Sequence, residues 1–213
     1  MQAVPTAQQV GDPCLDGCRA GRPEAIAELF RAHREMVERL VGRLVGPSPD
    51  LEDLVQSTFV EVIRNISRFR GEAKPSTWIC GIAVHIVQHH LRAGKVRRNV
   101  PLELVLGDTL RAQSAVVDPR QNAEQEIDGG KVTAKLYALM DRITAKKRVA
   151  LLLYVMEDRS VEEIAALMRA TQPATRSRLY FARRELRKLI ANDSDLRDWA
   201  RTLFSGRREE AET

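Results

Sequence analysis

Apolar residues recur along this chain at the three- and four-residue spacing of an α-helix. Such a stripe from Pro23 to Val45 predicts a long amphipathic helix. After the breaker Pro47–Pro49, a second helix is expected to begin at Asp50, because acidic residues in its first turn favour the helix dipole. A third is expected to follow Pro75 or Ser76. The pattern therefore predicts a helical N-terminal half.

Two shorter helices are predicted near the C-terminus. Ser160 and Glu163 have the spacing of a capping box, and an apolar face follows until Leu167. Thr171 then offers a side-chain oxygen as N-cap, and Pro173 lies in the first turn, where a missing N–H costs little. Polar and mostly basic residues surround the apolar stripe of this second helix: Gln172, Arg176, Arg178, Arg183, Arg184, Arg187 and Lys188. Together the two helices have the outline of a helix-turn-helix.

A helix that begins with glutamine and arginine side chains can enter the major groove of DNA. Arginine donates to guanine, the amide of glutamine pairs with adenine, and further arginines reach phosphates. A solvated surface helix would have a similar composition, so this segment alone leaves both interpretations open. The cluster Lys146–Arg148, at the start of another predicted helix, is expected to add a phosphate contact.

A second motif lies in the N-terminal half and favours the DNA-binding interpretation. Residues 53–59 run Asp-Leu-Val-Gln-Ser-Thr-Phe, residues 69–73 run Phe-Arg-Gly-Glu-Ala, and Thr77-Trp78 and Ile82-Ala83 follow. In these residues, their order and their spacing, the chain resembles the extracytoplasmic-function (ECF) group of bacterial RNA polymerase sigma factors. The resemblance implies an all-α fold of two small helical domains joined by a flexible linker, the C-terminal domain being the helix-turn-helix.

The resemblance also divides the chain. It covers a region 2-like domain at about 23–98 and a region 4-like domain at about 131–190, which leaves an N-terminal extension (1–22), a linker (99–130) and a C-terminal helix and tail (191–213). Gly129–Gly130 lies where the family continues a helix, and two glycines there cost about 2 kcal/mol relative to alanine. A break is therefore expected before Lys131.

Functional positions carry over from the resemblance residue by residue. It implies that RNA polymerase core is bound by Asp53, Leu54, Val55 and Gln56. It implies that a loop captures a flipped base of the minus-10 element and consists of Arg70, Gly71, Glu72, Ala73 and Lys74. It implies that the helix after this loop also binds the minus-10 element, through His85, His89, Arg92, Lys95, Arg97 and Arg98. It implies that the minus-35 element is bound by Thr171, Gln172, Thr175, Arg176, Arg178 and Arg183.

General physical chemistry supports these implied roles. Opening a duplex requires that unstacked bases be held, which a loop pocket beside a basic helix achieves by fit and by neutralising the backbone. Linking two DNA contacts raises the effective concentration of the second. The implied partners are RNA polymerase core, promoter DNA and an anti-sigma protein.

Composition narrows the function classes further. The 213-residue chain has a formal charge of +5, which favours an anionic partner, but acidic residues are frequent, so the basic character is local. No apolar run is long enough to cross a membrane and no signal peptide is evident, so we expect a cytoplasmic protein without membrane insertion. No catalytic constellation is present, so we expect neither an enzyme nor a cofactor.

Cysteine and histidine residues raise the question of a metal site. Cys14 and Cys18 are four residues apart and, with a histidine such as His33, resemble part of a zinc ligand set. A fourth ligand at proper spacing is missing. The alternative is that the cysteines are reduced thiols. His85 and His89 share a helix face, where contact with DNA is the simpler interpretation. No metal is therefore expected. A stand-alone helix-turn-helix regulator acting as a dimer and a histidine-based metal enzyme are the rival functions.

Overall fold

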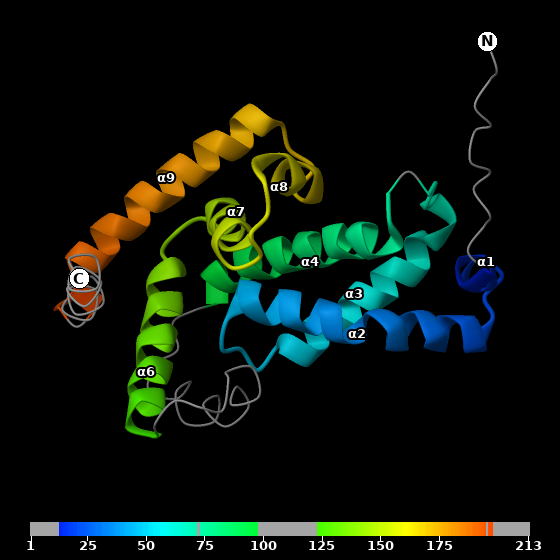
Figure 1. The fold of residues 1–213 in the computed structure, drawn as a ribbon, viewed down its shortest axis with the longest axis horizontal. Helices are drawn as coiled ribbons and strands as arrows, with labels where there is room; N and C mark the ends of the chain where they lie inside the picture. Colours follow the sequence, from blue (N-terminus) through cyan, green and yellow to red (C-terminus); the bar gives the residue numbers. More distant parts are fainter. Residues whose placement is uncertain (1–12, 72, 98–122, 195, 198–213) are drawn as a thin grey trace, which may run out of the picture.

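The computed structural model describes residues 13–71, 73–97, 123–194 and 196–197, and among these residues it contains helices and no strand. The N-terminal unit comprises α1 (Pro13–Arg19), α2 (Pro23–Val45), α3 (Leu51–Asn65), the short 3-10 helix η1 (Ile66–Arg68) and α4 (Pro75–Arg97). The C-terminal unit comprises α6 (Ala123–Met140), α7 (Ala145–Val155), α8 (Val161–Leu167) and α9 (Gln172–Ala191) (Figure 1). The predicted all-α fold is confirmed.

Helices α2, α3 and α4 pack against one another around the core of the N-terminal unit. Val41, Val55, Val62 and Val84 are fully buried there. The predicted helix from Pro23 to Val45 is confirmed at both ends. Its proline lies in the first turn, and Gly46 ends it with a φ of 76°, a left-handed backbone that favours glycine. The apolar stripe of the sequence is thus the stripe that the fold buries.

Helix α6 continues through Gly129 and Gly130. The predicted break before Lys131 is wrong, because helix propensity is a weak preference that tertiary packing overrides. The last turns of α6 supply that packing, since Tyr137 is 8% exposed and Met140 is 2% exposed. None of the helices among the described residues is both long and apolar enough to span a bilayer.

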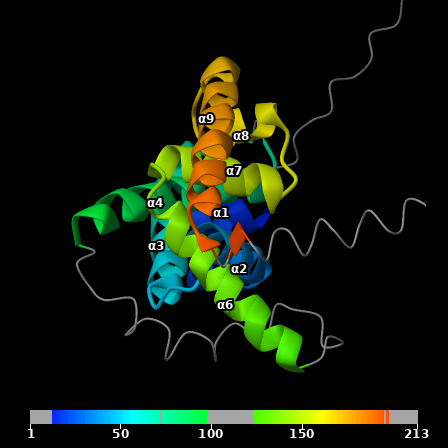
Figure 2. The same cartoon turned by 90° about the vertical axis from the view of Figure 1, so that its left-hand side faces the viewer.

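The two units lie against each other. Helix α4 contacts both α7 and α8, and α2 contacts α7, so that α7 and α8 lie along one side of the N-terminal unit (Figures 1 and 2). A single cluster of buried apolar residues runs through both units and includes Val84 of α4 as well as Val149 of α7 and Ile164 of α8. The sequence predicted two modules joined by a linker, and it gave no sign of this shared core.

Candidate nucleic-acid interface

Helices α8 and α9 form the predicted helix-turn-helix. The hydroxyl of Ser160 accepts a 3.1 Å hydrogen bond from the Glu163 amide, and the Glu163 carboxylate accepts one of 2.9 Å from the Ser160 amide. The predicted capping box is thereby confirmed. The hydrogen bonds of Glu163 to the Ser160 backbone and to Arg159 lower the pKa of its carboxyl below the ordinary range.

A tight turn joins the two helices. Arg169 has a φ of 47°, a left-handed conformation that reverses the chain after α8. The Ala170 amide donates a 2.8 Å hydrogen bond to the Ala165 carbonyl, which satisfies an end group of α8. Thr171 then caps α9 as predicted, since its hydroxyl accepts from the Ala174 amide at 3.4 Å.

Helix α9 presents a basic face to solvent. Its inward face consists of Thr175, Leu179 and Ala182, all buried. Its exposed side chains include most of the predicted basic residues: Arg176, Arg183, Arg184, Arg187 and Lys188. Gln172 and Arg178 are half-buried. The amide of Gln172 donates to the Glu162 carboxylate at 3.2 Å, which orients it at the start of the helix. By helical spacing, Gln172, Arg176 and Arg183 share one flank of the buried face, and Arg178 lies on the other flank. One predicted residue is an exception to this exposure.

Thr175 is the exception, because its side chain is buried and has no exposed area. Its hydroxyl donates a 3.1 Å hydrogen bond to the Thr171 carbonyl one turn earlier. In this arrangement the side chain cannot reach a base. Thr175 therefore stabilises the start of α9, and the contact surface is formed by its exposed neighbours.

Aromatic and acidic residues hold two of the basic side chains in place. The guanidinium of Arg183 lies 4.5 Å from the ring centre of Tyr154, at the end of α7. Lys147 forms an ion pair with Glu185 and lies 5.6 Å from the ring centre of Phe181. Both contacts join α7 to α9. These contacts add to the packing of the buried face of α9 in joining the two helices.

The four residues predicted to bind polymerase core, 53–56, differ in their burial. Leu54 is 6% exposed and Val55 has no exposed area, so both lie in the apolar core between α2, α3 and α4. Asp53 and Gln56 are exposed on the outer face of α3. Leu54 and Val55 are thus not available for a direct contact. Their burial fixes the face on which Asp53 and Gln56 lie.

The predicted minus-10 loop has a rigid base and an exposed tip. Phe69 is buried, and its ring centre lies 5.1 Å from that of Trp78. Arg19 of α1 donates a 2.7 Å hydrogen bond to the Phe69 carbonyl. The exposed residues that follow are Arg70, Gly71, Ala73 and Lys74, and Glu72 lies outside the described residues. Trp78 is half-buried and anchors the loop.

The outer face of α4 continues this surface. His85, His89 and Arg92 are exposed and follow one another at helical spacing, so they share one face. The side chains of Lys95 and Arg97, and all of Arg98, lie outside the described residues. No group of histidine, cysteine or acidic residues suited to a metal ion occurs in the described part of the chain.

Comparison with known families supports the division into two units. The family model for Sigma-70 region 2 matches residues 29–97, and the model for Sigma-70, region 4, matches residues 133–186. The chain belongs to the sigma-70 family. The first match covers α3, the loop and α4, and the second covers the helix-turn-helix, so both proposed DNA-binding surfaces lie in matched regions. The stand-alone regulator is not favoured, because region 2 has no role in it.

Curated relatives place the chain in the ECF group. It is 32% identical over 170 residues to the ECF RNA polymerase sigma factor SigE of Mycolicibacterium smegmatis, covering 78% of this chain and 62% of that protein. It is 26% identical over 165 residues to the RNA polymerase sigma factor HrpL of Pseudomonas syringae pv. syringae, covering 78% of this chain and 86% of that protein. The chain thus spans less than two thirds of SigE and most of HrpL.

Among solved structures, the fold is similar to that of CnrH, which was solved in complex with the cytosolic domain of CnrY. The TM-score is 0.50 at 20% identity, and the match covers 85% of this chain and 97% of CnrH. At this identity the likeness concerns the fold alone. It agrees with the helical architecture described above.

Proposed function

We propose that this chain is a dissociable promoter-recognition subunit that binds RNA polymerase core in the bacterial cytoplasm and directs it to specific start sites. One observation carries the proposal: a single chain combines the exposed loop of region 2 with an exposed basic helix in region 4. In this role the chain itself needs no catalytic group, since the polymerase supplies the chemistry.

Each surface has a defined part in the proposed function. Asp53 and Gln56 on α3 contact the polymerase core. The loop from Arg70 to Lys74 holds an unstacked base of the minus-10 element, with His85, His89 and Arg92 beside the neighbouring phosphates. Gln172, Arg176 and Arg178 contact the minus-35 element in the major groove.

Reconstitution with purified core polymerase tests this function. Transcription from a library of genomic fragments should begin at a defined set of sites when the chain is added, and those start sites should share two upstream elements. The variant Gln56→Ala should weaken core binding, whereas Arg64→Ala, near the end of the same helix with a 73% exposed side chain, should not. Absence of site-selective initiation by the wild-type chain would refute the function.

We also propose that a separate anti-sigma protein holds the chain inactive. Two features support this proposal: both DNA surfaces are exposed and basic, and the similar protein CnrH was solved with a bound partner. A tagged chain purified from its own cells should carry a protein that competes with core polymerase in a binding assay. Recovery of the chain with polymerase alone, under every growth condition tried, would contradict this.

A further inference from the structure

The short helix α1 packs beside the base of the predicted minus-10 loop. It contacts α2, and it also contacts η1, the short helix that the loop follows. Leu15 and Cys18 of α1 are buried in the core, at 5% and 2% exposed. Gly17 lets α1 and α2 approach closely, because a Cβ built on it would lie 2.5 Å from Cβ of Ala25. These contacts fix the position of α1 on the N-terminal unit.

Arg19, in the last turn of α1, joins this helix to the loop through both arms of its guanidinium. Its Nη1 forms a 2.7 Å ion pair with Oδ1 of Asp16, which lies three residues earlier in α1. Its Nη2 donates a 2.7 Å hydrogen bond to the Phe69 carbonyl. The guanidinium is planar, and its nitrogens have a fixed mutual geometry. The ion pair with Asp16 therefore sets the direction in which Nη2 donates.

Phe69 is the last residue before the exposed part of the loop, and three contacts hold it. Its amide donates to the Ile66 carbonyl at 3.2 Å. Its buried ring packs against the ring of Trp78. The third contact is the hydrogen bond from Arg19 to its carbonyl. The first two contacts hold the amide and the side chain, whereas the third holds the carbonyl side, from which the chain continues into the loop.

The carbonyl of Phe69 determines the direction in which the loop starts. This oxygen and the amide nitrogen of Arg70 belong to one planar peptide group, so a hydrogen bond that fixes the oxygen also fixes that amide. Arg70 is exposed, and Gly71 follows it with a φ of 76°. A loop that is ordered before it meets a base loses less conformational entropy on binding. The contact from Arg19 therefore favours the capture of a base.

We propose that Arg19 is a positioning residue for the minus-10 element, because it holds the first peptide group of the loop in the orientation that receives an unstacked base. This inference rests on the proposed function. The match to the Sigma-70 region 2 model begins at residue 29, so α1 lies outside the matched residues. Recognition of the minus-10 element then depends on a residue that precedes the matched region.

Binding of single-stranded DNA to the reconstituted holoenzyme tests this role. The probe is a fluorescent oligonucleotide with the non-template sequence of the minus-10 element that the start sites share, and the reference is the same oligonucleotide with its sequence scrambled. Arg19→Ala should lower the affinity for the minus-10 oligonucleotide about tenfold, which corresponds to the freedom of roughly one backbone residue. The affinity for the scrambled oligonucleotide should stay at the wild-type value, because the phosphate contacts are unchanged.

Two further variants separate the orientation of Arg19 from its charge. Arg19→Lys keeps the positive charge but replaces the planar fork by a point charge on a flexible stem, so it should recover only part of the affinity for the minus-10 oligonucleotide. Asp16→Ala keeps Arg19 but removes the partner that orients it. This variant should lower the same affinity about twofold to fivefold, the range expected for an exposed ion pair.

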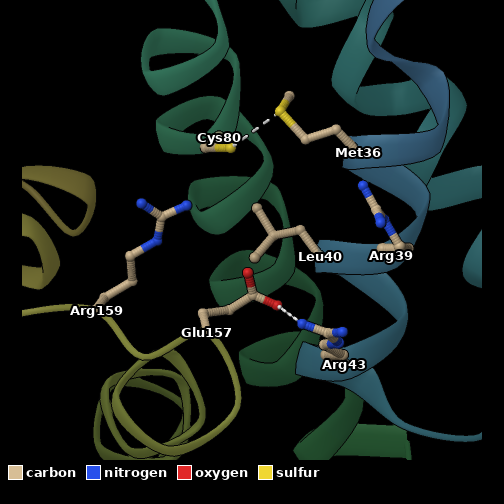
Figure 3. Close-up of a pocket in the computed structure, with 7 residues that line it drawn as sticks. All are labelled: Met36, Arg39, Leu40, Arg43, Cys80, Glu157 and Arg159. Carbon is tan, nitrogen blue, oxygen red and sulfur yellow. Dashed lines mark hydrogen bonds and ion pairs between the residues drawn. The ribbon is translucent and has the colours of Figure 1, made fainter.

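Arg39→Ala is the matched control, because it removes the same charge from the neighbouring helix α2. Arg39 forms an ion pair with Glu35 of its own helix. It also lines a cavity of about 250 Å³ between α2, α4 and the loop after α7 (Figure 3). It lies about 24 Å further along α2 than Pro23, the residue with which that helix begins. This variant should bind both oligonucleotides like the wild type.

Three outcomes would overturn the positioning role. The first is wild-type affinity of Arg19→Ala for the minus-10 oligonucleotide. Equal losses on both oligonucleotides, or full recovery in Arg19→Lys, would show instead that Arg19 acts through its charge. If Arg19→Ala fails to fold, Asp16→Ala decides, and wild-type affinity of that variant would overturn the role. Failure of the proposed function is distinct, because it would appear as absent site-selective initiation with the wild-type chain.

Discussion

The ring of Tyr137 lies directly against Gly46, the residue that ends α2. A Cβ built on Gly46 would lie 2.3 Å from Cδ1 of the ring, and the hydroxyl of the same side chain donates to the Arg43 carbonyl at 2.7 Å. Burial raises the pKa of the Tyr137 hydroxyl, and this effect outweighs the opposing influence of Arg148 and Arg43. The hydroxyl therefore stays protonated and donates at neutral pH.

Gly46→Ala should destabilise the folded chain by at least about 2 kcal/mol, because a methyl group would overlap the Tyr137 ring and Gly46 has a backbone conformation that few other residues adopt. Chemical denaturation of the two proteins measures the difference. Gly42→Ala is the control: it lies one turn earlier, and its added Cβ would meet only Leu51 at 3.9 Å. An equal loss of unfolding free energy in both variants would show that overlap with the Tyr137 ring is not what destabilises Gly46→Ala.

Thr175→Val should cost about 1 kcal/mol of stability, because it removes the hydrogen bond to the Thr171 carbonyl and leaves the volume nearly unchanged. Affinity for the minus-35 element should stay at the wild-type value, since the side chain has no exposed area. Thermal unfolding and a DNA titration measure the two quantities separately. A loss of affinity for the minus-35 element without a loss of stability would show that the Thr175 side chain does contact DNA.

Several helices and their ends could be predicted from the sequence, because their signals are local, whereas the start of α6 could not. The cap at Thr171, the capping box at Ser160 and the stripe from Pro23 to Val45 each depend on a few neighbouring residues. The resemblance supplied both surfaces that are proposed to bind DNA. It did not separate exposed from buried positions within a motif, which is why Val55 and Thr175 were predicted as contacts.

Arg148 illustrates what local patterns miss. Within the cluster Lys146–Arg148 it was predicted to contact a phosphate, but its side chain is buried and donates to backbone carbonyls at the end of α2. One signal was present: Arg148 lies three residues after Ala145 and four before Leu152, on the buried face of α7. The partner carbonyls are about a hundred residues away in the sequence, and no local pattern identifies them.

The capping box should make stability depend on pH below neutrality. The pKa of Glu163 is lowered by its hydrogen bonds to the Ser160 backbone and to Arg159, so the folded state binds a proton less readily than the unfolded state. The contribution of Glu163 is therefore present above its unfolded pKa and is lost as the pH falls towards its lowered folded pKa. Thermal unfolding of the wild type and Glu163→Gln should differ most near neutral pH and converge in acid.

Glu162→Gln is the control for this comparison, because Glu162 lies in the same first turn but its carboxylate accepts from the Gln172 side chain. The difference in unfolding temperature between Glu162→Gln and the wild type should change less with pH. A wild-type profile parallel to that of Glu163→Gln across the acid range would show that the carboxylate makes no pH-dependent contribution.

Arg176→Ala should weaken binding of the chain to minus-35 DNA and reduce its salt dependence. Arg176 is exposed on the first turns of α9, where an arginine reaches a phosphate or a base edge. If the contact is to a phosphate, the slope of log K against log salt should fall by about one and affinity should drop for every sequence. If it is to a guanine, the loss should be about 1 to 3 kcal/mol and confined to one base position.

Titrations at several salt concentrations, on the native element and on single-base variants, distinguish these outcomes. Arg64→Ala removes the same charge from α3, where the side chain is 73% exposed and lies 4.0 Å from Glu61, and it should leave the slope unchanged. Equal slopes and equal affinities for Arg176→Ala and the wild type would place the DNA contact away from the start of α9. The basic residues further along, Arg184, Arg187 and Lys188, would then be the next candidates, because they are exposed on the same helix.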